Sequence, residues 1–352
     1  MTAEEIEQLV RPNIQSLSPY RSARDDYQKG LLLDANENSY GAPFRNQLNL
    51  HRYPTPVHQE LVQTIAGWRQ VEPEQVFTGV GSDEPIDLLI RTFCNPGSGS
   101  ILITPPTYGM YKVSARINDV NVLETPLDAS FQPDTRAILE KAKQSTPSIL
   151  FLCSPNNPTG NDLDRTSILK LVELFPGLVV VDEAYIDFSR QESMAPMVRQ
   201  YPNLVVLQTF SKSFGLAGIR LGIAIAPVQI IEWLLKIKPP YNLNKLTAEA
   251  GLEAFEHLDL IRFNIEEIRK ERKRLADELG SLGSVEKVWP SHANFILFKI
   301  RDAEQVWKTL VRKGIIIRNR GNEPGCENCL RATIGLPDEN DRLIQALKEV
   351  AP

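Results

Sequence analysis

The sequence predicts an α/β fold in which a mostly parallel central sheet is covered by helices on both faces. Three short apolar runs, at 149–153, 178–182 and 204–208, have the composition of buried strands. Segments with helical periodicity, such as 164–175, separate the strands, as expected for β-α-β crossovers. All three strands end in polar side chains, and open α/β sheets bind ligands at the carboxyl ends of their strands. The fold and the place of a binding site are therefore predicted together.

The other elements of this sheet begin near residue 56. Amphipathic helices are expected at 57–68 and 82–93, and Ser82 is the N-cap of the second, whose first turn is acidic. Strands are expected at 76–79, 101–103, 121–124, 149–153, 178–182, 204–208 and 221–226.

The pattern changes near residues 239–242, where two prolines stand together. A long helix with one charged face is expected at 248–279. Further strands at 293–300, 314–318 and 329–334, with helices at 303–312 and 338–350, indicate a smaller α+β domain. We divide the chain into an N-terminal arm at 1–50, which is expected to form part of the small domain, a large cofactor-binding domain at 51–240 and a small C-terminal domain at 241–352.

Composition and charge limit the classes of function. The chain has 352 residues, 42% of them hydrophobic and 24% charged, which is typical of a globular protein. A net charge of −5 gives no reason to expect nucleic acid or an anionic membrane as a partner. No apolar run approaches the roughly 18 residues that span a bilayer. The first residues are acidic and lack the pattern of a signal peptide, so a cytoplasmic protein is expected.

Cys326 and Cys329 form a C-x-x-C pair, which is compatible with half a zinc site, a redox pair or an ordinary loop before a strand. Zinc would need two more ligands, and the four histidines are not paired at metal spacing. We therefore expect no metal.

Lys212 is the most informative residue of the chain. It follows an apolar strand and is flanked by the hydroxyls of Thr209, Ser211 and Ser213, with Arg220 eight positions further on. Hydroxyls and a guanidinium both donate hydrogen bonds to phosphate oxygens. A lysine beside such a pocket indicates a Schiff base with a phosphorylated aldehyde, which means pyridoxal phosphate. A strand-end lysine in a polar loop is the alternative interpretation.

The two neighbouring strands end in residues that a pyridine ring could use. Asn157 follows the strand at 149–153, and Asp182 and Tyr185 follow the strand at 178–182. An aspartate can keep a pyridine nitrogen protonated, and asparagine and tyrosine can donate to a phenolate oxygen. Single residues of these types are ordinarily turn formers, but three strand ends with this chemistry favour a cofactor site.

Two loops add candidates. The turn at 79–84 opens a helix with Ser82 and Asp83, and backbone N–H groups at a helix start bind phosphate, although a tight strand-to-helix turn has the same sequence. Tyr108 follows the strand at 101–103 and could stack on a pyridine face or simply pack in its loop.

These motifs resemble those of the fold-type I pyridoxal-phosphate-dependent aminotransferases. The resemblance rests on SPNNPTG at 154–160, DEAY at 182–185 and SKSFGLAGIRLG at 211–222. Within this group the chain is most similar to the histidinol-phosphate aminotransferases of histidine biosynthesis, through LSPY at 17–20, DANEN at 34–38, RYP at 52–54, GSDE at 81–84, PPTYGMY at 105–111 and LRATIG at 330–335. The motifs cover the chain from about residue 17 to 336. Ser39 stands where the family usually has proline.

The resemblance implies pyridoxal 5′-phosphate as cofactor and assigns roles to particular residues. Lys212, Asp182 and Tyr185 are expected to be catalytic. The expected cofactor-binding residues are Ser82, Asp83, Tyr108, Asn157, Asp182, Tyr185, Thr209, Ser211, Lys212 and Arg220.

The resemblance also implies a substrate pocket and a homodimer. Arg331 would clamp the anionic group of the substrate, with Arg318 nearby and Tyr20 and Asn38 lining the pocket. Tyr53 would reach the cofactor phosphate of a partner subunit. The implied reaction is reversible amino transfer between L-histidinol phosphate and 2-oxoglutarate, which yields imidazole-acetol phosphate and L-glutamate.

Three alternatives stay open on the sequence alone. A threonine-phosphate decarboxylase shares these motifs and also binds a phosphorylated substrate. An aromatic amino-acid aminotransferase would prefer an unphosphorylated ring. A non-enzymatic regulator of the same fold would need a DNA-binding domain before residue 50, where neither a helix-turn-helix pattern nor a basic stretch occurs.

Overall fold

The computed structural model describes residues 1–44 and 48–350, and its larger domain is built on a seven-stranded sheet. The strand order is β1-β7-β6-β5-β4-β2-β3, and only β7 runs antiparallel to its neighbours. The seven strands correspond to the seven predicted: β1 (Val76–Val80), β2 (Ser100–Ile103), β3 (Asn121–Glu124), β4 (Ile149–Cys153), β5 (Leu178–Asp182), β6 (Leu204–Thr209) and β7 (Leu221–Ile225).

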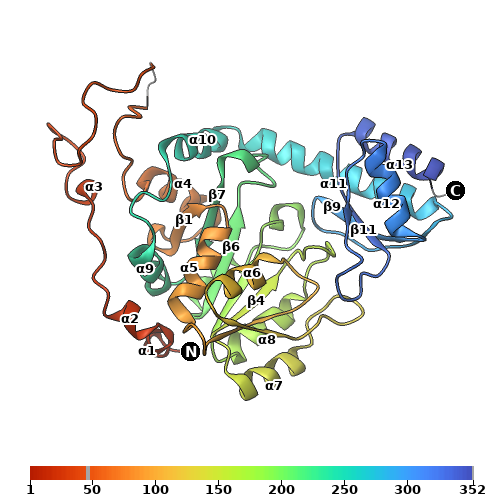
Figure 1. Cartoon of the computed structure of the whole chain (residues 1–352), viewed down its shortest axis with the longest axis horizontal. Helices are drawn as coiled ribbons and strands as arrows, with labels where there is room; N and C mark the ends of the chain where they lie inside the picture. Colours follow the sequence, from red (N-terminus) through yellow and green to blue (C-terminus); the bar gives the residue numbers. More distant parts are fainter. Residues whose placement is uncertain (45–47, 351–352) are drawn as a thin grey trace.

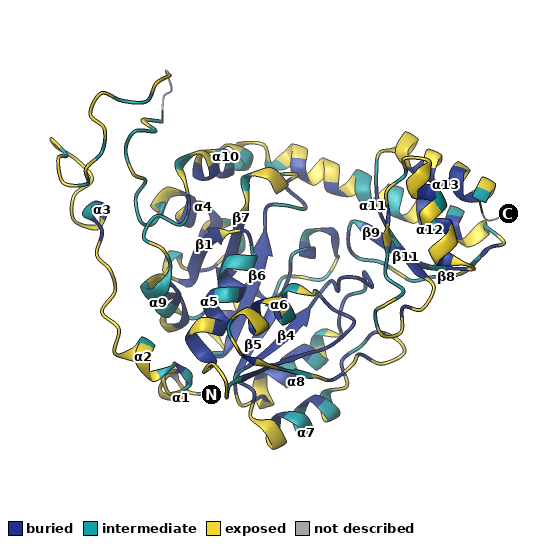
Figure 2. Cartoon of the chain, in the orientation of Figure 1, coloured by how far each residue is buried: buried dark blue, intermediate teal, exposed yellow. Residues whose placement is uncertain are grey.

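Helices cover both faces of this sheet, as expected (Figure 1). On β4, Leu150 packs into one core cluster with α4, α7 and α8, while its neighbours Ile149 and Phe151 pack into a second cluster with α5, α6 and α9. Successive side chains of a strand point to opposite faces, so a strand buried on both sides must be apolar throughout. The helices are α4 (Gln59–Arg69), α5 (Asp83–Phe93), α6 (Met110–Ile117), α7 (Thr135–Ser145), α8 (Arg165–Leu174), α9 (Val228–Ile237) and α10 (Lys245–Glu256). The inner strands β2, β4, β5, β6 and β7 are buried along their whole length, whereas the edge strand β3 is partly exposed (Figure 2).

The smaller domain packs helices against an antiparallel sheet of order β10-β11-β9-β8. Its elements are α11 (Leu258–Ser281), β8 (Val285–Val288), β9 (Phe295–Ile300), α12 (Ala303–Arg312), β10 (Arg318–Asn319), β11 (Cys329–Thr333) and α13 (Pro337–Val350). The single helix predicted at 248–279 is two helices, because His257 leaves helical geometry at φ −115° and ψ 25°. The strand predicted at 314–318 was largely wrong: Gly314 has φ +78°, and pairing is confined to Arg318 and Asn319.

The first residues of the N-terminal arm pack on the large domain. The side chains of Ile6 and Val10 are buried in the core cluster that contains Phe93 and Leu234. The Arg11 N–H donates to the carbonyl of Thr92 at 2.9 Å. Figure 1 shows α1 (Ala3–Leu9) and α2 (Pro12–Gln15) on the side of the molecule away from α12 and α13, with α3 (Ala23–Asp26) further along the arm. Further along the arm, the carbonyls of Leu48 and Asn49 accept hydrogen bonds from Nζ of Lys245, which lies in the segment assigned to the small domain.

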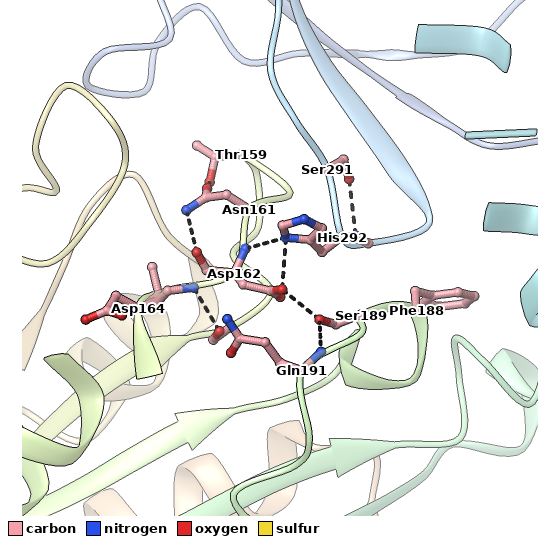
Figure 3. Close-up of polar contacts among 12 residues, drawn as sticks. Thr159, Asn161, Asp162, Asp164, Phe188, Ser189, Gln191, Ser291 and His292 are labelled. Atoms are coloured by element: carbon pink, nitrogen blue, oxygen red, sulfur yellow. Dashed lines mark hydrogen bonds and ion pairs between the residues drawn. The ribbon is translucent and has the colours of Figure 1, made fainter. Parts of the chain in front are cut away.

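The two domains meet at a polar junction between the loop after β4 and the loop before β9 (Figure 3). Oδ2 of Asp162 accepts a hydrogen bond from Ser189 at 2.7 Å and lies 2.9 Å from Nδ1 of His292. The His292 N–H donates to the carbonyl of Gly160 at 2.6 Å. These contacts hold the small domain beside the loop that carries Asn157.

Candidate active site

A cavity opens at the carboxyl ends of β4, β5 and β6, where the sequence predicted a ligand. It is lined by Ser82, Asp83, Tyr108, Cys153, Asn157, Asp182, Ala184, Tyr185, Thr209, Ser211, Lys212, Ala217 and Arg220. This list contains every residue of the predicted cofactor set except Tyr53. The segments that supply them are far apart in the sequence, and the parallel sheet brings their ends together.

Asp182 is the buried acid of the cavity. It is the last residue of β5 and its exposed fraction is 2%. Its Oδ2 accepts a hydrogen bond from the Tyr111 hydroxyl at 2.6 Å, and its Oδ1 accepts one from the Ala184 N–H at 3.1 Å. Burial raises the pKa of this carboxyl to about 6, against an ordinary value of 3.8. A cationic ring nitrogen beside it would stabilise the charged form.

Lys212 lies three residues beyond the end of β6, half-buried at the cavity wall. Its Nζ is 5.5 Å from the centroid of the Tyr185 ring. Burial, and then the charges of Arg331 and Arg220, hold the pKa of this amine below its usual range. A lowered pKa leaves more of the amine unprotonated, which is the form that attacks a carbonyl or accepts a proton.

The opposite end of the cavity is a cradle for an anion. Nη1 of Arg220 lies 3.3 Å from Oγ of Ser211, and the Thr209 hydroxyl donates to the same oxygen at 2.9 Å. Nη2 of Arg220 lies 3.4 Å from Oδ2 of Asp83. Two hydroxyls and a guanidinium directed at one space match the donor set that binds phosphate.

The start of α5 completes this cradle. A Cβ on Gly222 would lie 2.1 Å from the carbonyl carbon of Gly81, so only glycine lets β7 approach the turn so closely. Gly81 itself has φ +68°, and a Cβ there would meet the Arg220 guanidinium at 2.5 Å. The close approach places Ser82, the N-cap of α5, beside Arg220 with the N–H groups of the first helical turn nearby.

Tyr108 and Asn157 stand at the side of the cavity. The Tyr108 hydroxyl donates to Oδ1 of Asp83 at 3.0 Å, and its ring makes an edge contact with Tyr111 at 5.5 Å. Oδ1 of Asn157 accepts a hydrogen bond from Nη1 of Arg331, a residue of β11 in the small domain. The Arg331 guanidinium lies 4.9 Å from the Phe295 ring centroid. Arg331 is thereby held at the cavity edge by a contact between the domains.

The other predicted substrate residues do not reach this cavity within one chain. Arg318 pairs with Arg331 across β10 and β11, but its side chain is exposed. Tyr20 is 77% exposed on the arm, and Oδ1 of Asn38 accepts from the Tyr40 N–H. Tyr53, the remaining predicted cofactor-binding residue, also lies outside the cavity: it is 49% exposed and stacks on Tyr241 with ring centroids 4.6 Å apart.

Four residues of the site were missed. Tyr111 donates to Asp182, and Cys153, Ala184 and Ala217 line the cavity. Tyr111 lies three positions after Tyr108, and this helical spacing together with the predicted strand end was the available signal. Cys153 is the last residue of β4, so its position at a strand end was a comparable signal that it lies near the ligand site.

Residues 1–44 and 48–350 contain neither a candidate metal cluster nor a membrane-spanning helix. No cluster of three histidine, cysteine or acidic residues with the spacing of a metal site occurs among them. None of the helices in this part of the chain is long and apolar enough to cross a membrane.

Comparison with known proteins agrees with this geometry. The family model for class I and II aminotransferases matches residues 28–347. A histidinol-phosphate aminotransferase from Cytophaga hutchinsonii is 47% identical over 97% of this chain and 98% of its own length. Another from Flavobacterium johnsoniae is 48% identical over 99% of both chains. The crystal structure of the histidinol-phosphate aminotransferase from Clostridium acetobutylicum superposes with a TM-score of 0.79 at 26% identity, covering 86% of this chain and 91% of that one. The chain therefore belongs to the family of class I and II aminotransferases.

Proposed function

We propose that this aminotransferase binds pyridoxal 5′-phosphate and transfers an amino group reversibly between L-histidinol phosphate and 2-oxoglutarate, as a step of histidine biosynthesis. The observation that carries the proposal is one cavity in which Lys212 lies between the buried acid Asp182 and the cradle of Ser211 and Arg220. The products are imidazole-acetol phosphate and L-glutamate.

The cavity's donors and acceptors fit this cofactor. Asp182 accepts hydrogen bonds from a hydroxyl and a backbone N–H, so a protonated ring nitrogen would supply the positive charge that this buried carboxylate favours. Arg220, with Ser82, Thr209 and Ser211, would hold the phosphate. Lys212 would carry the aldehyde carbon, and Tyr108 would cover one face of the ring. Asn157 and Tyr185 would donate to its phenolate oxygen.

The protein's own groups then perform the proton transfers. The bound cofactor supplies an electron sink that makes the Cα proton of the substrate acidic. The Lys212 amine, whose pKa lies below its usual range, would take that proton at Nζ. Asp182 would keep the positive charge on the ring nitrogen, and the burial of this carboxyl would exclude water from it.

The substrate assignment rests on relatives and on charge. Relatives that match this chain over nearly their whole length bear the name histidinol-phosphate aminotransferase. A phosphate-bearing substrate needs more donors than a carboxylate does, and Arg331 at the cavity edge, with Arg318 on the neighbouring strand, could provide them. Tyr20 and Asn38 would join the substrate pocket from a partner subunit's arm.

The proposal includes a homodimer in the cytoplasm. Tyr53, Tyr20 and Asn38 lie outside the cavity of their own chain, so their expected roles require a second copy. Large apolar side chains of the arm, such as Leu31 at 87% and Leu33 at 72% exposed, would be covered by the partner. An active monomer in sedimentation velocity would contradict this part.

A panel of amino donors tests the substrate. The holoenzyme is mixed with L-histidinol phosphate, L-phenylalanine or L-threonine phosphate, and the change in the cofactor's visible absorbance is followed with carbon dioxide release. We expect rapid conversion by histidinol phosphate without carbon dioxide. Preferential conversion by phenylalanine would identify an aromatic aminotransferase instead. Release of carbon dioxide from L-threonine phosphate would identify a decarboxylase.

A further inference from the structure

A polar network of largely buried side chains contacts the two segments that carry Lys212 and Asp182. The hydroxyl of Ser213, the residue after Lys212, donates to Oδ2 of Asp187 at 2.5 Å. Oδ1 of Asp187 accepts from Nη2 of Arg69 at 2.7 Å. The side chains of Arg69 and Asp187 are only 12% and 18% exposed. The segment that carries Lys212 is thus tied to the end of α4.

The same guanidinium reaches the segment that carries Asp182. Nε of Arg69 donates to Oε1 of Gln208 at 2.7 Å, and Nε2 of Gln208 donates to Oε2 of Glu183 at 2.9 Å. Glu183 follows Asp182 directly and has an exposed fraction of 2%. Arg69 therefore makes two hydrogen bonds in two directions, one toward each catalytic segment.

The arginine is itself held in place. Its guanidinium lies over the Trp68 ring at 3.4 Å from the centroid. A planar fork with several donors can serve two acceptors at once, which an ammonium group on a flexible stem does less well. In a low-dielectric interior such a satisfied network rigidifies the groups that it joins.

We propose that Arg69 is a positioning residue for the reaction: through Asp187 and Ser213 it fixes the backbone that carries Lys212, and through Gln208 and Glu183 the backbone that carries Asp182. The inference deepens the proposed function and rests on the roles proposed there for Lys212 and Asp182. None of the five network residues lines the cavity, so each acts through a neighbour. Proton transfer needs near-contact distances, and a misplacement of about 1 Å can cost about a hundred-fold in rate.

The network also connects to the small domain. Arg269 of α11 donates to the backbone carbonyls of Asp187 and Ser189, and Nη1 of Arg272 donates to that of Phe188 at 3.2 Å. The short helix at Ile186–Phe188 is thus held from both sides. Asp187 is the residue at which these two sets of contacts meet.

Four substitutions in the full-length holoenzyme test the proposal. Ser213→Ala removes the hydroxyl at little structural cost, and Ser213→Thr restores it. Asp187→Asn keeps the shape of the side chain and removes its negative charge. Arg69→Lys keeps the positive charge but removes the planar guanidinium that donates to two acceptors. Arg199→Gln is the matched control, because Arg199 forms an arginine–carboxylate pair with Glu72 on the exposed surface, 49% and 64% exposed.

Four quantities are measured for each variant: kcat, KM, the pH titration of the cofactor's visible band, and the melting temperature. We expect Ser213→Ala, Asp187→Asn and Arg69→Lys to lower kcat by about ten- to a hundred-fold with little change in KM. The visible band should titrate at a shifted pH. Ser213→Thr should recover most of kcat, and Arg199→Gln should match the wild type.

Wild-type kcat and titration in Ser213→Ala and Asp187→Asn, with only the melting temperature lowered, would show that the network is structural and overturn the inference. That result is distinguishable from failure of the proposed function, because loss of the Lys212 side chain tests the latter directly. If Lys212→Ala is inactive while Ser213→Ala is fully active, the inference about the network is wrong and the proposed function stands.

Discussion

Tyr111 donates a hydrogen bond of 2.6 Å to Oδ2 of Asp182, a residue of the cavity lining, and both side chains are buried. The Tyr111 ring stacks on Phe151 with centroids 4.6 Å apart, so the hydroxyl is fixed in position. The bond favours the ionised carboxylate, while burial opposes it more strongly. The balance makes Asp182 a group whose charge depends on whether a cationic partner is bound.

Asp182→Asn should stabilise the cofactor-free protein at high pH. Because burial raises the folded-state pKa to about 6, the carboxyl's contribution to stability is present in full at low pH and is lost as pH rises through about 6. Asparagine avoids that loss, which is at most about 3 kcal/mol for a shift of this size. Urea unfolding of the cofactor-free proteins near pH 8 and near pH 5 measures it.

The gain should be largest near pH 8 and shrink toward pH 5. Glu253→Gln, on the exposed face of α10, is the control for the loss of one negative charge. In the holoenzyme the same Asp182→Asn change should instead abolish most activity, since the ring nitrogen loses its anionic partner. If Asp182→Asn stabilised the cofactor-free protein equally at both pH values, the raised pKa of the buried Asp182 carboxyl would be contradicted.

The strands and their polar ends were predictable because a parallel sheet imposes a local pattern. A strand buried on both faces must be apolar, and the first polar residue after it must lie at the sheet edge. That reasoning located Asn157, Asp182 and Lys212 without any tertiary information. It did not find the network around Arg69, because its links join residues as much as 139 positions apart and depend on how α4 packs.

Other features were set by tertiary contacts. Nothing in the helical pattern of 248–279 distinguishes one long helix from two joined at His257, because the break lies in the backbone angles of one residue. The packing of Ile6 in the arm against α5 and α9 likewise depends on contacts between segments far apart in the sequence. Tyr53, Tyr20 and Asn38 remain predictions that a single chain cannot bring into a site.

Lys212→Ala should remove both catalysis and the lysine-linked absorbance of the cofactor. The base that moves the Cα proton is lost, and proton transfer of this kind contributes at least about a hundred-fold. Turnover and the visible spectrum are measured on the same sample. Lys170→Ala, an exposed lysine on α8, is the control and should behave as the wild type. A Lys212→Ala protein that keeps its turnover and spectrum would rule out the assignment.

Arg331→Gln should raise KM for both substrates while Arg318→Gln should not. Arg331 is held at the cavity edge by Asn157 and lies 4.9 Å from the Phe295 ring centroid, so its charge is partly desolvated beside the cavity. Loss of hydrogen bonds to a charged group costs about 1.5–3 kcal/mol, or roughly ten- to a hundred-fold in KM. Arg318 is exposed on β10 and should contribute less. Steady-state KM for histidinol phosphate and for glutamate checks this, and the opposite ranking would move the substrate anion to Arg318.

Hybrid dimers test whether Tyr53 completes the site of a partner subunit. Tyr53→Ala should weaken cofactor binding. The cofactor phosphate in one subunit would lose the hydroxyl of the partner subunit's Tyr53, and the Tyr53 of the same chain lies outside the cavity. When Tyr53→Ala is refolded together with the inactive Lys212→Ala, each hybrid should contain one intact site, with Lys212 from one chain and Tyr53 from the other.

At limiting cofactor the hybrids should therefore be more active than either parent, and the gain should follow the fraction of hybrid dimers in the mixture. Tyr27→Ala is the control, since Tyr27 is also exposed on the arm, at 68%. If Tyr53 served only the cavity of its own chain, the Lys212→Ala subunit could contribute no functional tyrosine to the active one. Activity of the mixture would then equal the average of the two parents, and the shared site would have to be abandoned.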